Sequence, residues 1–440
     1  MNAQIPILTS AIFLLSVISG FTAPELNILD AGAVPDGRTD NTVAFQKALD
    51  GTAGEGGGTV HVPAGHYKFS GHVKIPKNVT LRGSFAAAPY VSKEEIDKNS
   101  IPGSVLLPTT DKGNANGKPF ITMNSNSTIE GFIIHYPEWR DPAKNQPYVY
   151  PPCISSARKT SNISIKHTNI VDAYYGIRMI DSTRFLISDV QGYPSYRGIV
   201  VDGSDDASRI ENTHFIWQGG VIWAADEPYC EWVNFNGIAF EFGKSRFQTV
   251  SHCFSFGYGV GFKFSSTKRG ACDGSFIACG ADSAERAILV DKIREPGVAF
   301  INTVFLGHWF GKSAMGVVIN PGATGRLSIE NCWFAGSVTK NIWMKSDKAI
   351  LSVKNSSFVS WDNNQEGTSI PCIQIDAGTA SFTGNWFGYS AGWTAGKNHK
   401  QLLAGPNTKS LLFINNTGES NFILDNQAGD KALIKDNIAN

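Results

Sequence analysis

The sequence predicts an all-β protein built as a parallel β-solenoid, and three observations predict it. Charged residues make up 17% of the 440 residues, below the roughly 25% of average domains, and the 45 glycines favour a turn-rich fold. A motif of an apolar residue, a short polar turn and a second apolar residue recurs at intervals of about 24 residues. Within each unit, apolar and polar residues alternate as they do in half-buried strands.

The repeat is clearest at residues 327–336, where an alternating strand pattern runs into asparagine turn chemistry. A unit of about 24 residues is too small to bury its own apolar face, but units stacked in parallel register bury a continuous core and let successive asparagines form ladders. A propeller blade needs about 40 to 50 residues and a leucine-rich repeat needs a fixed leucine lattice, so neither fits. The matching segments are 165–170, 187–192, 210–215, 250–256, 277–282, 301–305, 329–334, 353–358, 382–387 and 414–418.

The first 23 residues are expected to be a signal peptide. Residues 5–18 form an apolar run that is too short to span a bilayer and lies where the apolar part of a secretory signal belongs. Cleavage is expected after Gly20 or Ala23, and residues 24–440 are expected to form one secreted or periplasmic domain without a membrane span. The alternative is that the run forms an apolar first strand.

A helix is expected to cap the solenoid near its amino terminus, around residues 39–51. Residues 39–42 supply the side chains that begin helices, Phe45 and Leu49 lie on one apolar face, and Gly51 ends the pattern. An uncovered solenoid end would expose apolar side chains and unpaired strand edges, so a cap is required there.

Charge and cysteine content exclude several function classes. The 38 Lys and Arg balance the 38 Asp and Glu, and no basic run is present, which argues against a nucleic-acid partner. The seven cysteines lack CxxC spacing, so neither a zinc site nor a disulfide framework is indicated. We expect no cofactor, and we expect the protein to be a monomer.

Two segments near the amino terminus resemble a known signature. Residues 30–49, beginning Asp30-Ala-Gly-Ala-Val-Pro-Asp-Gly, and residues 56–67, Gly-Gly-Gly-Thr-Val-His-Val-Pro-Ala-Gly-His-Tyr, resemble the start of the pectate-lyase-like superfamily. The resemblance implies a right-handed parallel β-helix. The middle of the chain is similar to uncharacterised polygalacturonase-related glycoside hydrolases, which implies a carbohydrate-active enzyme. The polygalacturonase catalytic set is not found, because only Ser204-Asp205-Asp206 matches one part of it.

Two long insertions between units indicate where a glycan could bind. A regular solenoid has no deep pocket, so substrate is expected in a groove bordered by longer turns, here residues 135–154 and 216–236. Aromatic faces stack on sugar rings, and arginines fix hydroxyl or carboxylate groups. The alternative is that the aromatic residues only pack the insertions onto the rod. The expected sugar-binding residues are Tyr136, Trp139, Arg140, Arg197, Trp217 and Trp223.

A glycoside hydrolase acting on a polysaccharide or oligosaccharide is the first expectation for function. This reaction needs two carboxyl groups about 5.5 Å apart for retention or about 6.5 to 9.5 Å apart for inversion. Asp206 and Asp205 are expected to supply one, and Glu138 or Asp282 the other. The structural alternatives are an Asp-rich turn at 205–206, a turn or cap at Asp282, and a surface ion pair at Glu138.

Two other functions stay open at this point. A polysaccharide lyase would remove the proton next to a uronate carboxyl, often with Arg or Lys, and a cation such as calcium would neutralise that carboxyl. Residues 202–206 could begin a calcium site but lack the rest of a loop motif. A non-catalytic glycan-binding solenoid would bind saccharide without turnover. Candidate basic residues for a lyase are Arg197, Arg209, Lys244, Arg246, Lys268 and Arg269.

Overall fold

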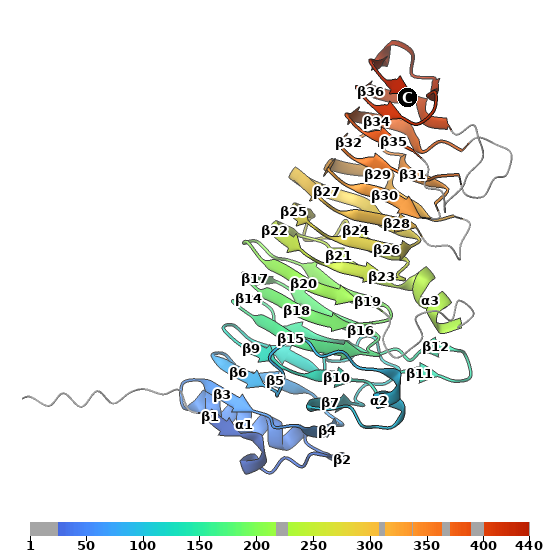
Figure 1. Cartoon of the computed structure of the whole chain (residues 1–440). Coiled ribbons are helices and arrows are strands. Elements are labelled where there is room, and N and C mark those ends of the chain that lie inside the picture. The colour runs from blue at the N-terminus through green and yellow to red at the C-terminus, as the bar shows by residue number, and fades with distance from the viewer. Residues whose placement is uncertain are drawn as a thin grey trace, which may run out of the picture.

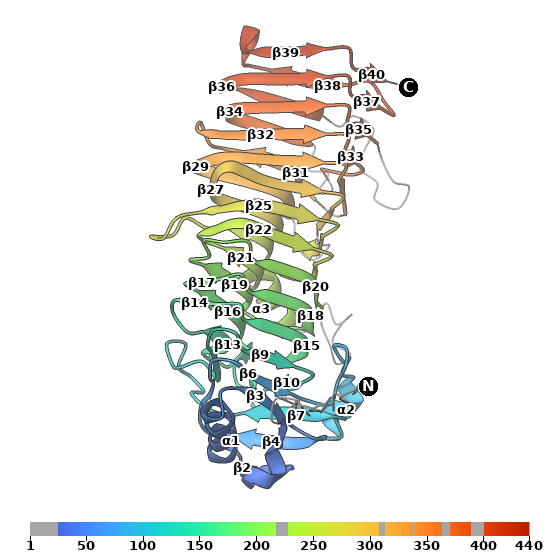
Figure 2. The same cartoon turned by 90° about the vertical axis from the view of Figure 1, so that its left-hand side faces the viewer.

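The chain winds into a rod of stacked parallel strands (Figure 1, Figure 2). The computed structural model describes residues 25–216, 228–307, 313–336, 338–362, 370–388 and 400–439. One sheet joins 36 strands of this part of the chain, and every pairing within it is parallel. The predicted fold class, a right-handed parallel β-helix, is confirmed. The expected signal peptide lies outside the described residues.

The strands form three ladders, which we call faces A, B and C in the order in which the chain visits them. Face A consists of β1 (Glu25–Asn27), β3 (Gly58–His61), β6 (Val79–Arg82), β9 (Thr128–Glu130), β22 (Ser245–Ser251), β25 (Cys272–Ile277), β32 (Ala349–Lys354), β39 (Ala432–Lys435), the starts of β15 (Ser164–Val171), β18 (Leu186–Gly192) and β20 (Arg209–Phe215), and the ends of β27 (Arg286–Ile301), β29 (Met315–Glu330), β34 (Ile373–Thr383) and β36 (Lys400–Ile414).

Face B follows a short turn after face A. It consists of β2 (Asp36–Asp40), β4 (Gly65–Phe69), β7 (Ser104–Pro108), β10 (Ile133–His135), β23 (Phe254–Phe256), β26 (Gly280–Ala284), β28 (Val304–Gly307), β30 (Trp333–Gly336), β33 (Ser357–Phe358), β35 (Trp386–Phe387), β37 (Thr417–Gly418), β40 (Ile438–Ala439) and the ends of β15, β18 and β20.

Face C completes each rung. It consists of β5 (Val73–Ile75), β8 (Ile121–Met123), β13 (Pro152–Ser156), β16 (Tyr175–Ile180), β19 (Arg197–Asp202), β21 (Ile238–Phe242), β24 (Val260–Phe264), β31 (Lys340–Met344), β38 (Ile423–Asn426) and the starts of β27, β29, β34 and β36. Two further pairs lie outside the rod, β11 (Arg140–Asp141) with β12 (Gln146–Pro147) and β14 (Thr160–Ser161) with β17 (Ser182–Thr183).

Asparagines at the turn from face A to face B form the ladders that the repeat predicts. Asn302 and Asn331 have φ values of 53° and 55°, a left-handed conformation that asparagine tolerates better than most residues. Asn331 Nδ2 donates to Asn302 Oδ1 at 2.6 Å. One position further on, the buried Asn385 donates to Asn416 at 3.0 Å, so polar side chains inside the rod satisfy one another from rung to rung.

Phenylalanines fill the interior in stacks that follow the strand spacing. The rings of Phe276 and Phe300 are 4.7 Å apart and those of Phe334 and Phe358 are also 4.7 Å apart, close to the ~4.8 Å between paired strands. All four side chains are fully buried. The alternation seen in the sequence therefore directs every second side chain of a strand into one continuous apolar core.

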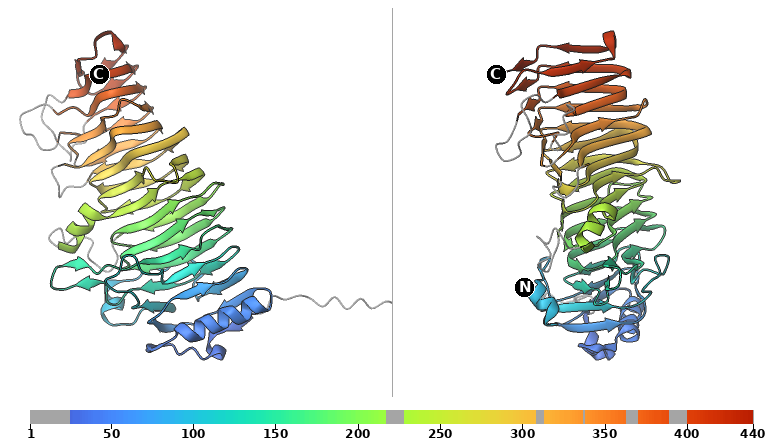
Figure 3. Two further views of the ribbon diagram at one scale, coloured as in Figure 1. Left: turned by 180° about the vertical axis from the view of Figure 1, so that it is seen from behind. Right: turned by 90° about the vertical axis from the view of Figure 1, so that its right-hand side faces the viewer.

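The helix α1 (Thr42–Gly54) lies at the amino-terminal end of the rod (Figure 3). It begins and ends three residues later than the expected range of 39–51. Phe45 packs edge-on against Phe69 at 4.8 Å. The Gln46 side chain donates to the Lys74 carbonyl at 3.1 Å and accepts from the Lys74 N–H at 2.8 Å, which occupies the free edge of β5. Among the described residues, no helix has the length and hydropathy of a bilayer span.

Three smaller elements were not anticipated. The 3-10 helix η1 (Ile28–Ala31) follows β1, α2 (Lys93–Asp97) lies between β6 and β7, and η2 (Gly429–Lys431) precedes β39. The helix α3 (Pro228–Asn236) lies within the long insertion after β20 and stands beside the rod near the β11–β12 pair (Figure 1). The chain visits this side of the rod each time it passes from face B to face C.

Replacing Phe276 by alanine tests the stacked core. Phe276 contacts Phe242 at 5.1 Å and Phe300 at 4.7 Å, so its removal leaves a cavity between rungs, and we expect a loss of about 3–5 kcal/mol in the free energy of unfolding. Phe247, whose side chain is 56% exposed, provides the matched control, and Phe247→Ala should change stability little. Equal shifts of the urea midpoint for the two variants would contradict this description of the core.

Candidate functional site

The predicted carboxylates Asp205 and Asp206 lie at the corner where face C turns into face A. Asp206 pairs with Arg184 at 2.9 Å and Asp205 with Lys244 at 2.7 Å, and both carboxylates are about half exposed. Asp205 lines a corner pocket of about 590 Å³, together with Arg184, the partner of Asp206. The Arg269 guanidinium in the same pocket holds the pKa of Asp181 below its usual range, so the Asp181 carboxyl is ionised at neutral pH. The corner pocket holds paired ions.

The structure does not bring Glu138 or Asp282 to this corner. Glu138 follows β10 at the turn from face B to face C and pairs with Lys112 at 2.8 Å, as its ion-pair alternative anticipated. Asp282 lies on β26 in face B, two rungs beyond β20. Because these positions lie on other sides of the rod, the expected pairing of Asp205 or Asp206 with Glu138 or Asp282 is corrected.

The Asp282 carboxyl lies in a partly buried environment that shifts its pKa. Burial raises its pKa above the usual range, while hydrogen bonds from the Ser283 backbone and hydroxyl oppose that shift only in part. A carboxyl with a raised pKa is the form that a general acid needs.

The predicted sugar-binding residues of the two insertions lie in different environments. Tyr136 is 2% exposed and its ring packs on Tyr150 at 4.9 Å, so its assignment to the sugar-binding surface is corrected to a core position. Trp139 is partly buried and packs edge-on against Tyr229 of α3 at 4.4 Å. Arg140 donates to Asn145 at 2.7 Å. Trp217 and Trp223 lie outside the described residues.

Arg197, another predicted binding residue, lies on face C and is partly buried. It begins β19 on face C, and its guanidinium lies 3.8 Å from the centre of the Tyr196 ring. Its Nη2 donates to the Tyr196 hydroxyl oxygen at 3.2 Å, and a weaker contact at 3.4 Å reaches the Asn236 carbonyl at the end of α3. These contacts fix the orientation of the guanidinium.

Aromatic residues of the preceding rung extend this surface. The Tyr174 ring stacks on Tyr196 at 4.8 Å with 17° between planes, and Tyr175 pairs in register with Arg197. Burial raises the pKa of the Tyr175 phenol, so it stays protonated at neutral pH. We call Tyr174, Tyr175, Arg178, Tyr196 and Arg197 the Tyr–Arg shelf.

Positive charge exceeds negative charge around the shelf. Glu241 on β21 accepts from Arg197 Nε at 2.8 Å and from the Ser265 hydroxyl at 2.6 Å, and Lys263 lies 3.7 Å from it. Arg178 donates from Nε to Ser155 Oγ at 3.2 Å, and no carboxylate of the described chain pairs with it. A ligand carboxylate could therefore bind Arg178 without displacing a protein partner.

A repeated pattern in the sequence points to the shelf, although the prediction from the sequence relied on the long insertions instead. Tyr174-Tyr175-Gly176-Ile177 and Tyr196-Arg197-Gly198-Ile199 occupy the same positions of consecutive repeats. Residues at equal positions of a solenoid stack one rung apart, at about 4.8 Å. Glu241 and Lys263 follow the same rule on the next two strands. In the described part of the chain, no group of three or more His, Cys, Asp or Glu residues is arranged to hold a metal.

Comparison with known families gives a match to the amino-terminal part of the chain. Residues 26–222 match the family described as rhamnogalacturonase A/epimerase, pectate lyase-like. The match includes the residues of the Tyr–Arg shelf.

Curated relatives match shorter stretches. The chain is 25% identical to the mannuronan C5-epimerase AlgE3 of Azotobacter vinelandii over 174 residues, which are 34% of this chain and 10% of that protein. It is 29% identical to alginate lyase 7 of the same organism over 124 residues, 26% of this chain and 14% of that protein. The chain thus spans about a tenth of the length of these relatives.

A solved structure shares the fold over almost the whole chain. The A-module of the mannuronan C-5 epimerase AlgE6 from Azotobacter vinelandii superposes with a TM-score of 0.57 and covers 94% of this chain and 99% of its own, at 14% identity. At this identity, the likeness establishes the parallel β-helix.

Two ion pairs of different burial provide a stability test. Glu241 and Arg197 are 17% and 15% exposed, so Glu241→Ala leaves a largely buried guanidinium without its partner, and we expect a loss of about 2–3 kcal/mol, below the ~3–5 of fully buried pairs. Asp206→Ala breaks a half-exposed pair and should cost under about 1 kcal/mol. Urea unfolding of both variants checks this, and equal losses would contradict the difference in burial.

Proposed function

We propose that this chain, which belongs to the pectate-lyase-like superfamily, is an exported enzyme that removes a proton next to the carboxylate of an acidic glycan bound along face C. The family is carbohydrate-active, and the reaction class is our inference. The observation that carries it is the Tyr–Arg shelf, where a phenol held by Arg197 lies on the same face as the carboxylate-free Arg178. The short curated matches to an epimerase and an alginate lyase support the same class.

Each shelf residue has a role in this reaction. Arg178 binds the uronate carboxylate and lowers the cost of negative charge on the neighbouring carbon. Tyr196 accepts the proton from that carbon, a role that requires its deprotonated form, and the Arg197 guanidinium donates a hydrogen bond to the accepting oxygen. Tyr174 and the nearby Trp232, 6.2 Å away, offer aromatic surface to the sugar rings.

In a lyase, the electron pair left by the proton forms a carbon–carbon double bond while the glycosidic carbon–oxygen bond breaks. The leaving oxygen takes a proton, for which Tyr175, kept protonated by burial on the neighbouring strand, is available. An epimerase would instead return a proton to the opposite side of the same carbon. The residues of face C are compatible with both a lyase and an epimerase, and analysis of the reaction products distinguishes the two.

Glycoside hydrolysis is the second candidate, and one observation favours it. Asp282 has a raised pKa, the property of a general acid. In a hydrolase it would protonate the leaving oxygen, with an ionised carboxylate as the second group.

Tyr196→Phe tests the first proposal. Loss of a proton-transfer group should lower kcat by about 10²–10⁴-fold without a change in thermal stability, because the ring contacts are retained. Activity is followed as ultraviolet absorbance of unsaturated products from alginate and polygalacturonate, with a neutral glucan as control. Tyr90→Phe, at a tyrosine that is 56% exposed and remote in sequence, is the matched variant and should keep full activity. Equal activity of the two variants would contradict the role of Tyr196.

Asp282→Asn with a pH series separates the second candidate from the first. A hydrolase that uses Asp282 as acid gains turnover as pH falls from neutral toward the raised pKa and loses it as pH rises, because only the protonated carboxyl donates. We expect Asp282→Asn to keep the activity and the pH profile of the parent, as proton abstraction at the shelf does not use it. Release of saturated reducing ends that disappears in Asp282→Asn would favour hydrolysis instead.

A further inference from the structure

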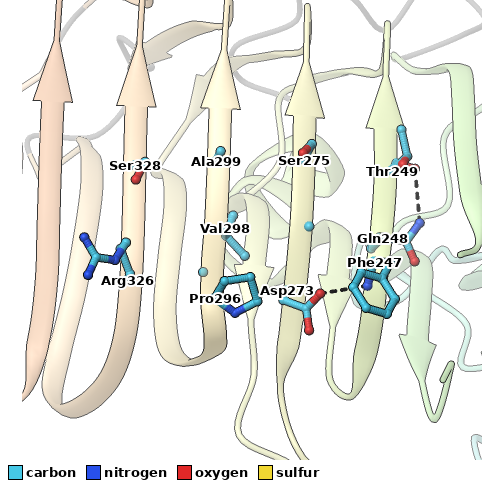
Figure 4. A pocket seen from close by; sticks show the side chains of 12 residues that line it. Phe247, Gln248, Thr249, Asp273, Ser275, Pro296, Val298, Ala299, Arg326 and Ser328 are labelled. Atoms are coloured by element: carbon cyan, nitrogen blue, oxygen red, sulfur yellow. Dashed lines mark hydrogen bonds between the residues drawn. The ribbon is translucent and has the colours of Figure 1, made fainter. Parts of the chain in front are cut away.

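A second cavity lies on face A, on a different side of the rod from the Tyr–Arg shelf. It has a volume of about 430 Å³ and crosses β22, β25, β27 and β29 (Figure 4). We call it the face A groove. None of the residues predicted from the sequence as catalytic or sugar-binding lines it.

The floor of the groove is flat and carries hydroxyl groups. Thr249, Ser275, Ala299 and Ser328 lie in register on four adjacent strands and form a row across the view in Figure 4. Gly297 allows the strands to pack closely here, because a Cβ at this position would lie 2.9 Å from the Arg326 carbonyl oxygen. Hydroxyls at the strand spacing suit a ligand that is itself rich in hydroxyl groups and runs along the rod.

An exposed aromatic residue stands at one end of the groove. Phe247 is 56% exposed and has a φ of 52°, a left-handed conformation that is an outlier for a bulky side chain. The Asp273 carboxylate of the next rung accepts from the Phe247 N–H at 2.7 Å, and Arg294 holds that carboxylate at 2.5 Å. Asp273 is itself 2% exposed. The buried Asp273 therefore fixes a strained backbone that presents the Phe247 ring to solvent. Such strain at an exposed aromatic residue is typical of functional positions.

An unpaired cation stands at the other end. Arg326 lies on β29, three strands from Phe247, which corresponds to about 14 Å. Its side chain is exposed, and among the described residues it has no hydrogen-bond or ion-pair partner. Asp273, the acidic residue in the groove, is already paired with Arg294. The open charge of the groove is therefore positive.

We propose that the face A groove binds a short acidic oligosaccharide along the rod axis, with Phe247 stacked on one sugar ring and Arg326 paired with a sugar carboxylate. Aromatic rings stack on the apolar faces of sugars, and a free guanidinium pairs with a carboxylate through two parallel hydrogen bonds. The serine and threonine hydroxyls of the floor bind the part of the oligosaccharide that lies between Phe247 and Arg326. This site holds the glycan beside the rod and takes no part in chemistry; its ligand class rests on the proposed function, but its residues do not.

Titration calorimetry with oligomannuronate trisaccharide tests the proposal in the Tyr196→Phe background, in which turnover is expected to be about 10²–10⁴-fold slower. We expect two equivalents to bind. Phe247→Ala and Arg326→Gln should each weaken one of them at least tenfold and leave the other, whereas Arg178→Gln should weaken the other one. Lys354→Gln, at an exposed lysine of face A outside the groove, and Trp333→Ala, at an exposed aromatic of face B, are the matched controls and should bind as the parent does.

The outcomes distinguish this inference from the proposed function. If Phe247→Ala and Arg326→Gln bind both equivalents normally, the face A groove is not a glycan site, whatever Arg178→Gln does. If Arg178→Gln alone has no effect, the face C proposal fails and the groove stands. Absence of any binding, or equal binding of neutral maltotriose in the groove, would overturn the assignment to an acidic oligosaccharide.

Discussion

The parallel register between rungs is the constraint on which the rest of this structure depends. Each strand pairs with the strand of the next repeat, so residues at equal repeat positions become neighbours at about 4.8 Å. The core rings of Phe276 and Phe300, the asparagine ladder of Asn302 and Asn331 and the Tyr174–Tyr196 stack all follow from this one rule. A functional surface on such a rod is a row of side chains that successive repeats supply.

The same rule explains how far the sequence could predict the fold and the site. The alternation of apolar and polar residues and the short polar turns were sufficient to predict the rungs, because both patterns recur in every repeat. The carboxylate site could not be assigned, because residues 202–206 lie close in sequence to the insertion after β20 but turn toward a different corner of the rod. Arg197 could be proposed from its residue type alone, whereas its neighbours Glu241 and Lys263 are reached only through rung-to-rung pairing across the insertion after β20.

Faces C and A present different chemistry on one scaffold. In the part of the chain that the structure describes, no carboxylate pairs with Arg178 of the shelf and no side chain pairs with Arg326 of the groove, which lies about 14 Å from Phe247. Between them, the corner pocket is occupied by ion pairs such as Arg269 with Asp181. Both open surfaces lie along the rod axis, which is the direction that an extended glycan needs to contact several rungs.

A crystal structure of the Tyr196→Phe variant with a bound uronate oligosaccharide tests the central claim most directly. The account predicts that the glycan lies along face C, with a sugar carboxylate on Arg178 and the adjacent carbon beside the ring of residue 196. A glycan bound in the corner pocket at Asp205, with the Tyr–Arg shelf left free, would contradict it.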